Sequence, residues 1–232
     1  EYRECVGINR KTNEIFEAHH DFAAAKTAYV FKTMVDPFIG KYSFVKVCSG
    51  VLKGDDVLYN PESDAEAKIG KIYTLSGNKP VEVQELFAGD IGAIAKLTST
   101  KTGDTLSTKN TPVSYGRTEY SKPYTYMKYV VNNKGDEDKV SQALAKMMAE
   151  DVTLKVVNDS ENRQSLIYGM GDQHLEVTAS KLAERYKVGI RLETPKVAFR
   201  ETIRKNSDVD TKYKKQSGGH GQYGHVKMRF EP

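Results

Sequence analysis

The sequence of 232 residues has few of the residues that build disulfide frameworks, metal centres or membrane spans. Its two cysteines, Cys5 and Cys48, are too few for a disulfide framework and do not have a metal-binding spacing, so we interpret both as structural. The histidine pairs, His19–His20 and His220 with His225, have no nearby Cys, Asp or Glu at a spacing that would complete a zinc site. No hydrophobic run is long enough to span a bilayer, and the first residues do not form a signal peptide. These absences predict a cytoplasmic protein with no membrane partner.

The sequence also lacks a nucleotide-binding P-loop. Gly219 and Gly224 have the glycine spacing of that motif, but His225 and Val226 occupy the positions where a lysine and a Ser or Thr must hold the phosphates and magnesium. We therefore expect no self-contained active site and no bound cofactor in this chain.

Short strands separated by turns predict a closed β-barrel in the first half of the chain. Three Gly-Asp pairs, Gly54–Asp55, Gly89–Asp90 and Gly103–Asp104, each precede a hydrophobic run, so we interpret them as turns in which glycine supplies a positive φ. The expected strands are 29–33, 41–49, 56–59, 70–75, 81–83, 92–97 and 105–106.

From residue 123 to residue 194 the sequence pattern changes to one that is typical of an α+β sandwich. Apolar residues at helical spacing, such as Val140, Leu144 and Met147, predict two amphipathic helices, with Met147 and Met148 in the core. The expected order is strand 124–131, helix 137–150, strand 152–157, strand 164–168, helix 172–186 and strand 188–192. This βαββαβ order predicts a ferredoxin-like sandwich.

The second helix follows the turn Gly169–Asp172, for which two interpretations stay open. Free N–H groups at the helix start can hold a phosphate or a carboxylate. Alternatively, the glycines only permit a tight turn that packs the helix on the sheet.

The chain ends in a basic, glycine-rich segment. From Lys196 to Pro232 there are nine Lys or Arg and four acidic residues, whereas the rest of the chain is nearly neutral. Glycines interleaved with cations, Tyr213 and Tyr223 predict a strand-loop-strand element that contacts a polyanion such as a nucleic acid. The alternative is a solvated hairpin, because loops with several lysines are common.

Six segments resemble one known family. They are 30–41 (VFKTMVDPFIGK), 89–91 (GDI), 102–106 (TGDTL), 169–177 (GMGDQHLEV), 195–203 (PKVAFRETI) and the loop 216–226. The chain resembles the translational GTPase elongation factor G over nearly its whole length, from about Glu4.

The resemblance implies a fragment of four parts. Residues 1–27 would be the linker and end of a missing GTP-binding domain, 28–118 the second domain as a translation-factor β-barrel, 119–195 the ferredoxin-like third domain, and 196–232 the start of the fourth domain, an incomplete α/β domain. GTP and magnesium are then expected on the missing N-terminal domain, so this fragment should not hydrolyse GTP. The implied function is GTP-dependent translocation of tRNA and mRNA on the ribosome.

The resemblance also implies where the chain meets its partners. The C-terminal loop would approach RNA in the decoding region, with Lys214 and Lys215 on phosphates, Gln222 hydrogen-bonding, and Tyr223 stacking or propping the hairpin. The candidates for this contact are Lys214, Lys215, Ser217, Gly218, Gly219, His220, Gly221, Gln222, Tyr223 and Gly224.

The third domain would contact ribosomal RNA, a small-subunit protein and the protein's own GTP-binding domain, while tRNA and mRNA would be reached indirectly. Its candidates are Gly169, Gly171, Asp172 and His174, with a relay or contact role.

Two departures from the family leave alternatives open. His220 stands where the family usually has arginine, and Asp172–His174 reads Asp-Gln-His where the family has Glu-Leu-His. Histidine is mostly neutral at physiological pH and cannot make the bidentate phosphate contact of arginine. A divergent paralogue acting in ribosome rescue, recycling or tetracycline ribosome protection is one alternative, and a stand-alone RNA-binding adaptor is another.

Overall fold

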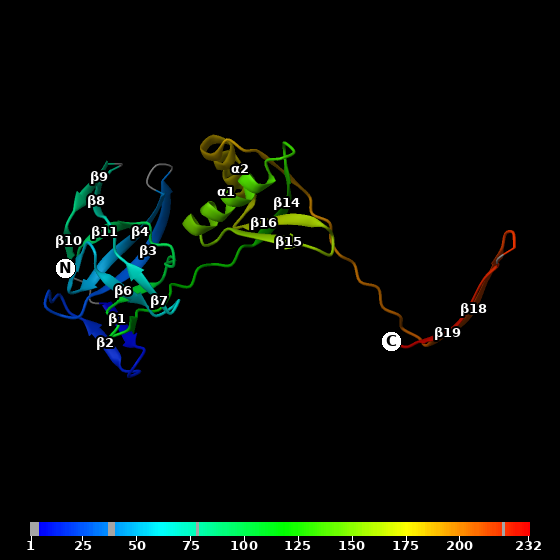
Figure 1. The fold of residues 1–232 in the computed structure, drawn as a ribbon, viewed down its shortest axis with the longest axis horizontal. Helices are drawn as coiled ribbons and strands as arrows, with labels where there is room; N and C mark the ends of the chain where they lie inside the picture. Colours follow the sequence, from blue (N-terminus) through cyan, green and yellow to red (C-terminus); the bar gives the residue numbers. More distant parts are fainter. Residues whose placement is uncertain (1–4, 37–39, 78, 220) are drawn as a thin grey trace. The chain divides into compact units, whose positions relative to one another are not determined.

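The computed structural model describes residues 5–36, 40–77, 79–219 and 221–232. It divides into two compact units, Glu1–Pro195 and Lys196–Pro232. Figure 1 shows a strand-rich chain whose two helices both belong to the first unit. Neither of these described helices has the length and apolar character that crossing a membrane requires.

The first half of the chain forms the expected β-barrel. Eight antiparallel strands pair in the order β7-β6-β12-β3-β4-β11-β8-β9, and a ribbon of β5 (Val51–Lys53) and β10 (Glu85–Phe87) completes the wall. The strands of the large sheet are β3 (Thr27–Asp36), β4 (Gly40–Ser49), β6 (Val57–Asn60), β7 (Ala65–Lys68), β8 (Ile72–Ser76), β9 (Lys79–Val83), β11 (Ile91–Ala95) and β12 (Thr105–Ser107).

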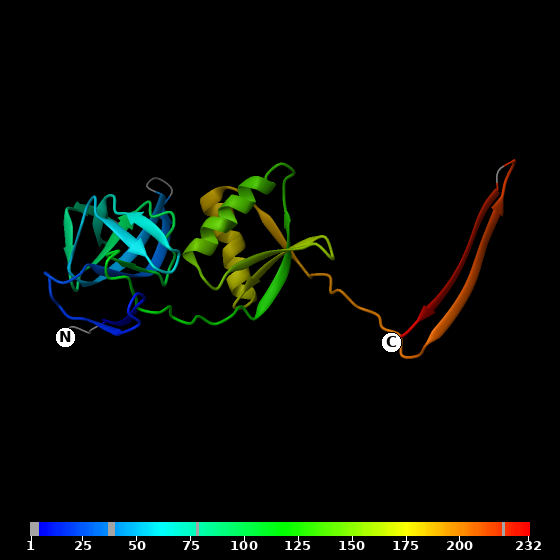
Figure 2. The ribbon, with the colours of Figure 1, turned by 60° about the horizontal axis from the view of Figure 1, so that its bottom comes forward.

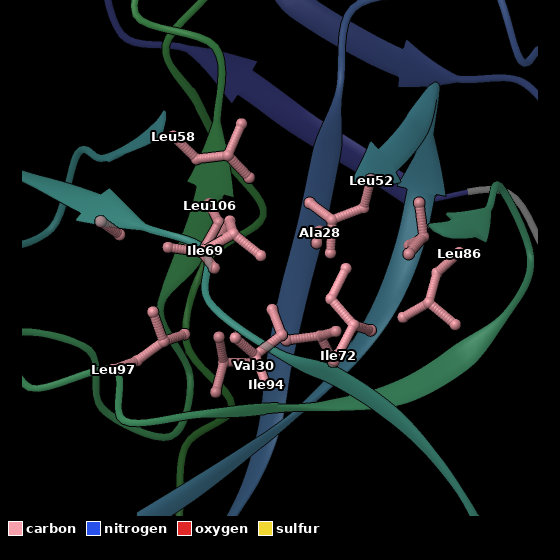
Figure 3. Close-up of a cluster of buried hydrophobic side chains, with 13 residues drawn as sticks. Ala28, Val30, Leu52, Leu58, Ile69, Ile72, Leu86, Ile94, Leu97 and Leu106 are labelled. Atoms are coloured by element: carbon pink, nitrogen blue, oxygen red, sulfur yellow. The ribbon is translucent and has the colours of Figure 1, made fainter. Parts of the chain in front are cut away.

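Side chains that alternate to the inside of this wall form the barrel core (Figure 3). Leu52, Leu58, Ile72 and Leu106, which come from four different strands, are each at most 2% exposed. Because each fully buried Leu or Ile contributes about 1.5–3 kcal/mol, this cluster is the main source of barrel stability.

The barrel wall also encloses a polar group. The Asp104 carboxylate is 1% exposed and accepts hydrogen bonds from the Asn60 amide and the Lys101 backbone N–H, both at 2.9 Å. Arg117 pairs with its other oxygen at 2.5 Å. The carboxylate therefore ties its own turn to Asn60, the last residue of β6, and to Arg117, which makes it part of the barrel architecture.

Residues 5–18, expected as part of a linker, form a hairpin. β1 (Cys5–Asn9) pairs with β2 (Ile15–Ala18) and also with β13 (Val113–Ser114), more than a hundred residues away in sequence. A Cβ added at Gly7 would lie 2.7 Å from the Ser114 carbonyl oxygen, so the two strands approach closely only because this residue is glycine. Periodicity did not reveal these strands, because both ladders are short and β13 is distant in sequence.

The expected ferredoxin-like sandwich is confirmed. Its antiparallel sheet has the order β15-β16-β14-β17, and both helices cover one face of it (Figure 2). Its elements are β14 (Thr125–Val131), α1 (Glu137–Glu150), β15 (Lys155–Asp159), β16 (Gln164–Gly169), α2 (Asp172–Tyr186) and β17 (Ile190–Glu193). Both helices have the expected bounds, Met147 is buried, and Met148 packs against the same core.

Smaller differences from the expected elements concern strand bounds and one turn. β15 and β17 begin two or three residues later than expected, and the short strands β5, β7 and β10 were missed. Gly89 and Gly103 have the expected positive φ values of 97° and 92°, but in the first Gly-Asp pair it is Asp55 that has φ 67°. Aspartate tolerates this left-handed conformation better than most residues do.

The second unit contains one antiparallel hairpin, β18 (Ser207–Gln216) and β19 (Gly221–Phe230). The expectation that residues 196–232 are the start of a fourth domain stays a prediction. The ladder runs closer to the turn than the sequence suggested, because Gly221–Gly224 already pair with Tyr213–Gln216.

Candidate nucleic-acid interface

The hairpin β18–β19 has two chemically different faces. Its ten residue pairs run without a bulge from Ser207–Phe230 to Gln216–Gly221, so alternate residues of both strands share a face. One face carries mostly apolar side chains: Val209, Tyr213, Val226, Met228 and Phe230. The other face carries mostly charged side chains.

On the charged face, cations and carboxylates balance near the base of the hairpin. Asp210 pairs with Lys227 at 3.0 Å and shares a hydrogen bond with His225, while Arg229 lies 3.9 Å from Asp208. These groups largely neutralise one another.

Towards the turn the same face is purely cationic. Lys212 and Lys214 follow Asp210 at alternate positions, and the ring of Tyr223 stands opposite Lys214. Lys215 lies on the other face, opposite Gln222. No Asp or Glu occurs between residues 211 and 230, so no carboxylate lies beside the positive charge near the turn, and the carboxylates of the hairpin, Asp208 and Asp210, are at its base.

These groups suit contact with a phosphate backbone. Lys212, Lys214 and Lys215 are exposed, and the Tyr223 side chain is 68% exposed. Lysines supply point charges for phosphates and an open aromatic ring can stack on a base. The structure thus brings Lys214, Gln222 and Tyr223 together at one end of the hairpin.

Lys212 was missing from the candidates named from the sequence, although it lies on the same face as Lys214. The signal was present in the sequence, because Asp208, Asp210, Lys212 and Lys214 alternate strictly. The prediction of a loop directly after Lys215 obscured this alternation.

The turn itself contains Ser217, Gly218 and Gly219, while His220 lies outside the described residues. Gly218 has φ +85°, so a side chain there would strain the backbone. By contrast, a Cβ added at Gly219 or Gly224 would meet nothing within 4 Å, and one at Gly221 would make only ordinary contacts of 3.7 Å or more. Packing within the hairpin therefore does not require glycine at these three positions.

The third-domain candidates lie in a turn that is held from within its own domain. A Cβ added at Gly169 would lie 2.7 Å from Leu175 Cδ2 and 3.0 Å from His174 Nδ1. One added at Gly171 would meet nothing within 4 Å. Asp172 is the first residue of α2, and its carboxylate lies 3.5 Å from the Thr125 hydroxyl.

Both ring nitrogens of His174 have partners. The Met170 backbone N–H donates to Nδ1 at 3.1 Å, and Nε2 lies 3.0 Å from the Asp151 carboxylate. Since Nδ1 accepts, the proton resides on Nε2. His174 thus ties the β16–α2 turn to the residue that follows α1, and this supports the interpretation of the motif as a tight packing turn.

Contacts with Thr153 and His174 lower the pKa of the Asp151 carboxyl. Burial alone would raise its pKa, but two hydrogen bonds from Thr153 and the interaction with His174 outweigh that effect. The pKa of Asp151 is therefore below its usual value. The described residues contain no group of three or more His, Cys, Asp or Glu arranged to hold a metal ion.

Comparisons with protein-family models match the chain in three consecutive segments. Residues 25–109 match elongation factor G domain 2, residues 121–194 match elongation factor G domain III, and residues 195–232 match elongation factor G domain IV. The chain belongs to the elongation factor G family. It is therefore a member of a translation-factor family, with these three domains in that order.

A solved structure is similar to most of this chain. A crystal structure of a Thermus thermophilus protein matches with a TM-score of 0.75 and 33% sequence identity. The match covers 90% of this chain but 32% of the Thermus chain, so this sequence spans about a third of that protein.

Proposed function

We propose that this chain works in a translation factor of the elongation factor G type, which promotes GTP-dependent translocation of tRNA and mRNA. Its hairpin would contact ribosomal RNA in the decoding region through the turn-proximal residues Lys212–Lys215 and Gln222–Tyr223. The observation that carries this proposal is the charge pattern, in which the carboxylates lie at the base and only cations lie near the turn. Such a pattern directs the positive end of the hairpin towards a polyanion.

The glycines near the turn support a close approach by a partner. Gly219, Gly221 and Gly224 have no packing reason to lack a side chain. A backbone without side chains can lie directly against RNA, where its N–H groups can donate to phosphate oxygens.

The third domain would contribute a rigid support and contacts with ribosomal RNA and a small-subunit protein. GTP and magnesium would bind on a GTP-binding domain outside this sequence. The matched Thermus chain is about three times as long as this one and has room for such a domain.

The test is binding of the chain to small ribosomal subunits across a series of salt concentrations. Lys214→Ala with Lys215→Ala should weaken binding and reduce the slope of log affinity against log salt by about one for each lysine. Lys68→Ala with Lys79→Ala, two exposed barrel lysines, is the matched control because it changes the net charge equally. Equal slopes for the two double variants would refute the hairpin contact.

A divergent paralogue that rescues or protects ribosomes is the second candidate. The departures at His220 and Gln173 from the family phrases favour it. Multiple-turnover translocation with the longer protein that carries the GTP-binding domain separates the two, because a rescue or protection factor would not sustain repeated translocation.

A further inference from the structure

The sheet β15-β16-β14-β17 presents one face that the helices do not cover. Side chains alternate along β14, so Met127 and Tyr129 pack into the core with α1 and α2, whereas Tyr126 and Lys128 point to the opposite face. The described residues place no helix over that second face (Figure 2). Its side chains are therefore available within this domain.

Tyrosines gather at one end of this face. Tyr126 and Tyr168 are register partners on the two central strands, and their rings stack with centroids 5.0 Å apart and planes 23° apart. Tyr124 precedes Tyr126 by two residues, its N–H donates to the Gly169 carbonyl, and its side chain is 78% exposed. We name Tyr124, Tyr126 and Tyr168 the tyrosine platform.

Tyr126 lies at the partly exposed end of β14. Tyr126 is 39% exposed. The edge strand β17 ends at Glu193, which pairs with Lys128, so no residue of a described strand pairs with β14 beside Tyr126 on that edge. A planar group can therefore extend the stack of two rings from this side.

One cation lies beside the platform, and two more lie further along the same face. Lys155 is the register partner of Tyr168 on β15 and is exposed, and Lys128 and Arg191 lie further along the same face. The facing carboxylates are Glu193, which pairs with Lys128 at 2.8 Å and Arg191 at 2.6 Å, and Asp159, which is engaged by its own turn. Cations thus outnumber carboxylates on this face.

A depression of about 700 Å³ lies at the opposite end of the sheet and reaches Lys128. Its lining includes Lys128, Lys134, Arg163 and Gln164, together with Glu137 and Asp159. An extended ligand can therefore run from the tyrosines along several lysine and arginine side chains.

We propose that the tyrosine platform binds single-stranded RNA, with a base stacking on Tyr126 to extend its stack with Tyr168, and phosphates contacting Lys155 and Lys128. The chemistry fits an unpaired strand because it combines open ring faces with flanking cations. RNA-binding domains built on a four-stranded sheet likewise stack bases on aromatic residues of that sheet. A protein partner would need exposed aliphatic area, but on this face Leu166 is buried and Val130 and Val157 are half-buried.

The experiment compares variants of the whole 232-residue chain for binding to a short fluorescein-labelled RNA of mixed sequence, by fluorescence anisotropy. Tyr126→Leu with Tyr168→Leu keeps bulk on the sheet but removes the aromatic faces, and should weaken binding of the single strand about tenfold or more. Tyr126→Phe with Tyr168→Phe should bind like the unmodified chain. If the leucine and phenylalanine variants bind equally well, or if the chain prefers the same RNA as a duplex, the proposal is wrong.

Two further variants separate this site from the hairpin. Tyr126→Leu with Tyr168→Leu should weaken RNA binding by the same factor when Lys214→Ala and Lys215→Ala are also present. The slope of log affinity against log salt should not change further, because stacking releases no counterions. Tyr120→Leu, at an exposed tyrosine outside the sheet, should have no effect. A loss seen only with intact hairpin lysines would show that the platform has no site of its own.

Discussion

Gly169 and Gly171 of the β16–α2 turn test whether this turn is closely packed, because a side chain has no space at the first and free space at the second. Gly169→Ala places a Cβ 2.7 Å from Leu175 Cδ2 and 3.0 Å from His174 Nδ1. Leu175 is fully buried and cannot move aside without disturbing α2, so we expect a loss of about 1–3 kcal/mol. Gly171→Ala has nothing within 4 Å and an extended backbone with φ −179°, so we expect a change within about 0.5 kcal/mol.

Thermal unfolding followed by far-UV circular dichroism measures this difference. α1 and α2 are the only α-helices in the described ranges of the chain, so helical ellipticity reports mainly on this domain. For a domain of this size each kcal/mol lowers Tm by about 4–8 °C. Equal melting temperatures for Gly169→Ala and Gly171→Ala would refute the packing argument.

Further predictions concern the barrel, the α1–β15 loop and the hairpin. Asp104→Ala should destabilise the barrel by about 3–5 kcal/mol, because it leaves the buried Asn60 amide and the Lys101 N–H without their acceptor. Asp104→Asn should destabilise it less. Equal midpoints of urea unfolding for both variants would contradict this. The pKa of Asp151 is lower in the folded state, so its contribution to stability is present above about pH 4 and is lost as the pH falls through its folded pKa. Thermal melts between about pH 3 and pH 6 should therefore show a weaker pH dependence for Asp151→Asn, and an unchanged dependence would argue against the shift. Lys212→Ala should reduce the salt slope of RNA binding as much as Lys214→Ala does, and a slope like that of the unmodified chain would remove Lys212 from the interface.

Helices and strands with a clear local pattern of apolar residues could be predicted from the sequence. Helices 137–150 and 172–186 have the expected bounds, because apolar residues at helical spacing are flanked by glycine and acidic residues at the helix starts. The hairpin β1–β2 and its pairing with β13 could not be predicted, because a ladder of two to four residues leaves almost no periodic signal and its partner is distant in sequence.

The candidate site was predicted only in part. The sequence located Lys214, Lys215 and Tyr223, but only the register shows that Tyr223 faces Lys214 while Lys215 points the other way. The platform residues Tyr126 and Tyr168 lie about forty positions apart, and no sequence pattern shows that their rings stack. Such pairs depend on strand register, which the sheet as a whole determines.

The most direct test of the central claim is hydroxyl-radical probing from the turn of the hairpin. Cys48 is fully buried, whereas Cys5 is half-buried. Replacing Cys5 with serine therefore leaves no accessible native thiol among the described residues, and one new reactive cysteine can be introduced. An iron chelate on Ser217→Cys should then cleave ribosomal RNA in the decoding region of the small subunit, whereas the same chelate on Lys79→Cys in the barrel should not. Cleavage from neither position, or the same pattern from both, would contradict the claim that the cationic turn contacts that RNA.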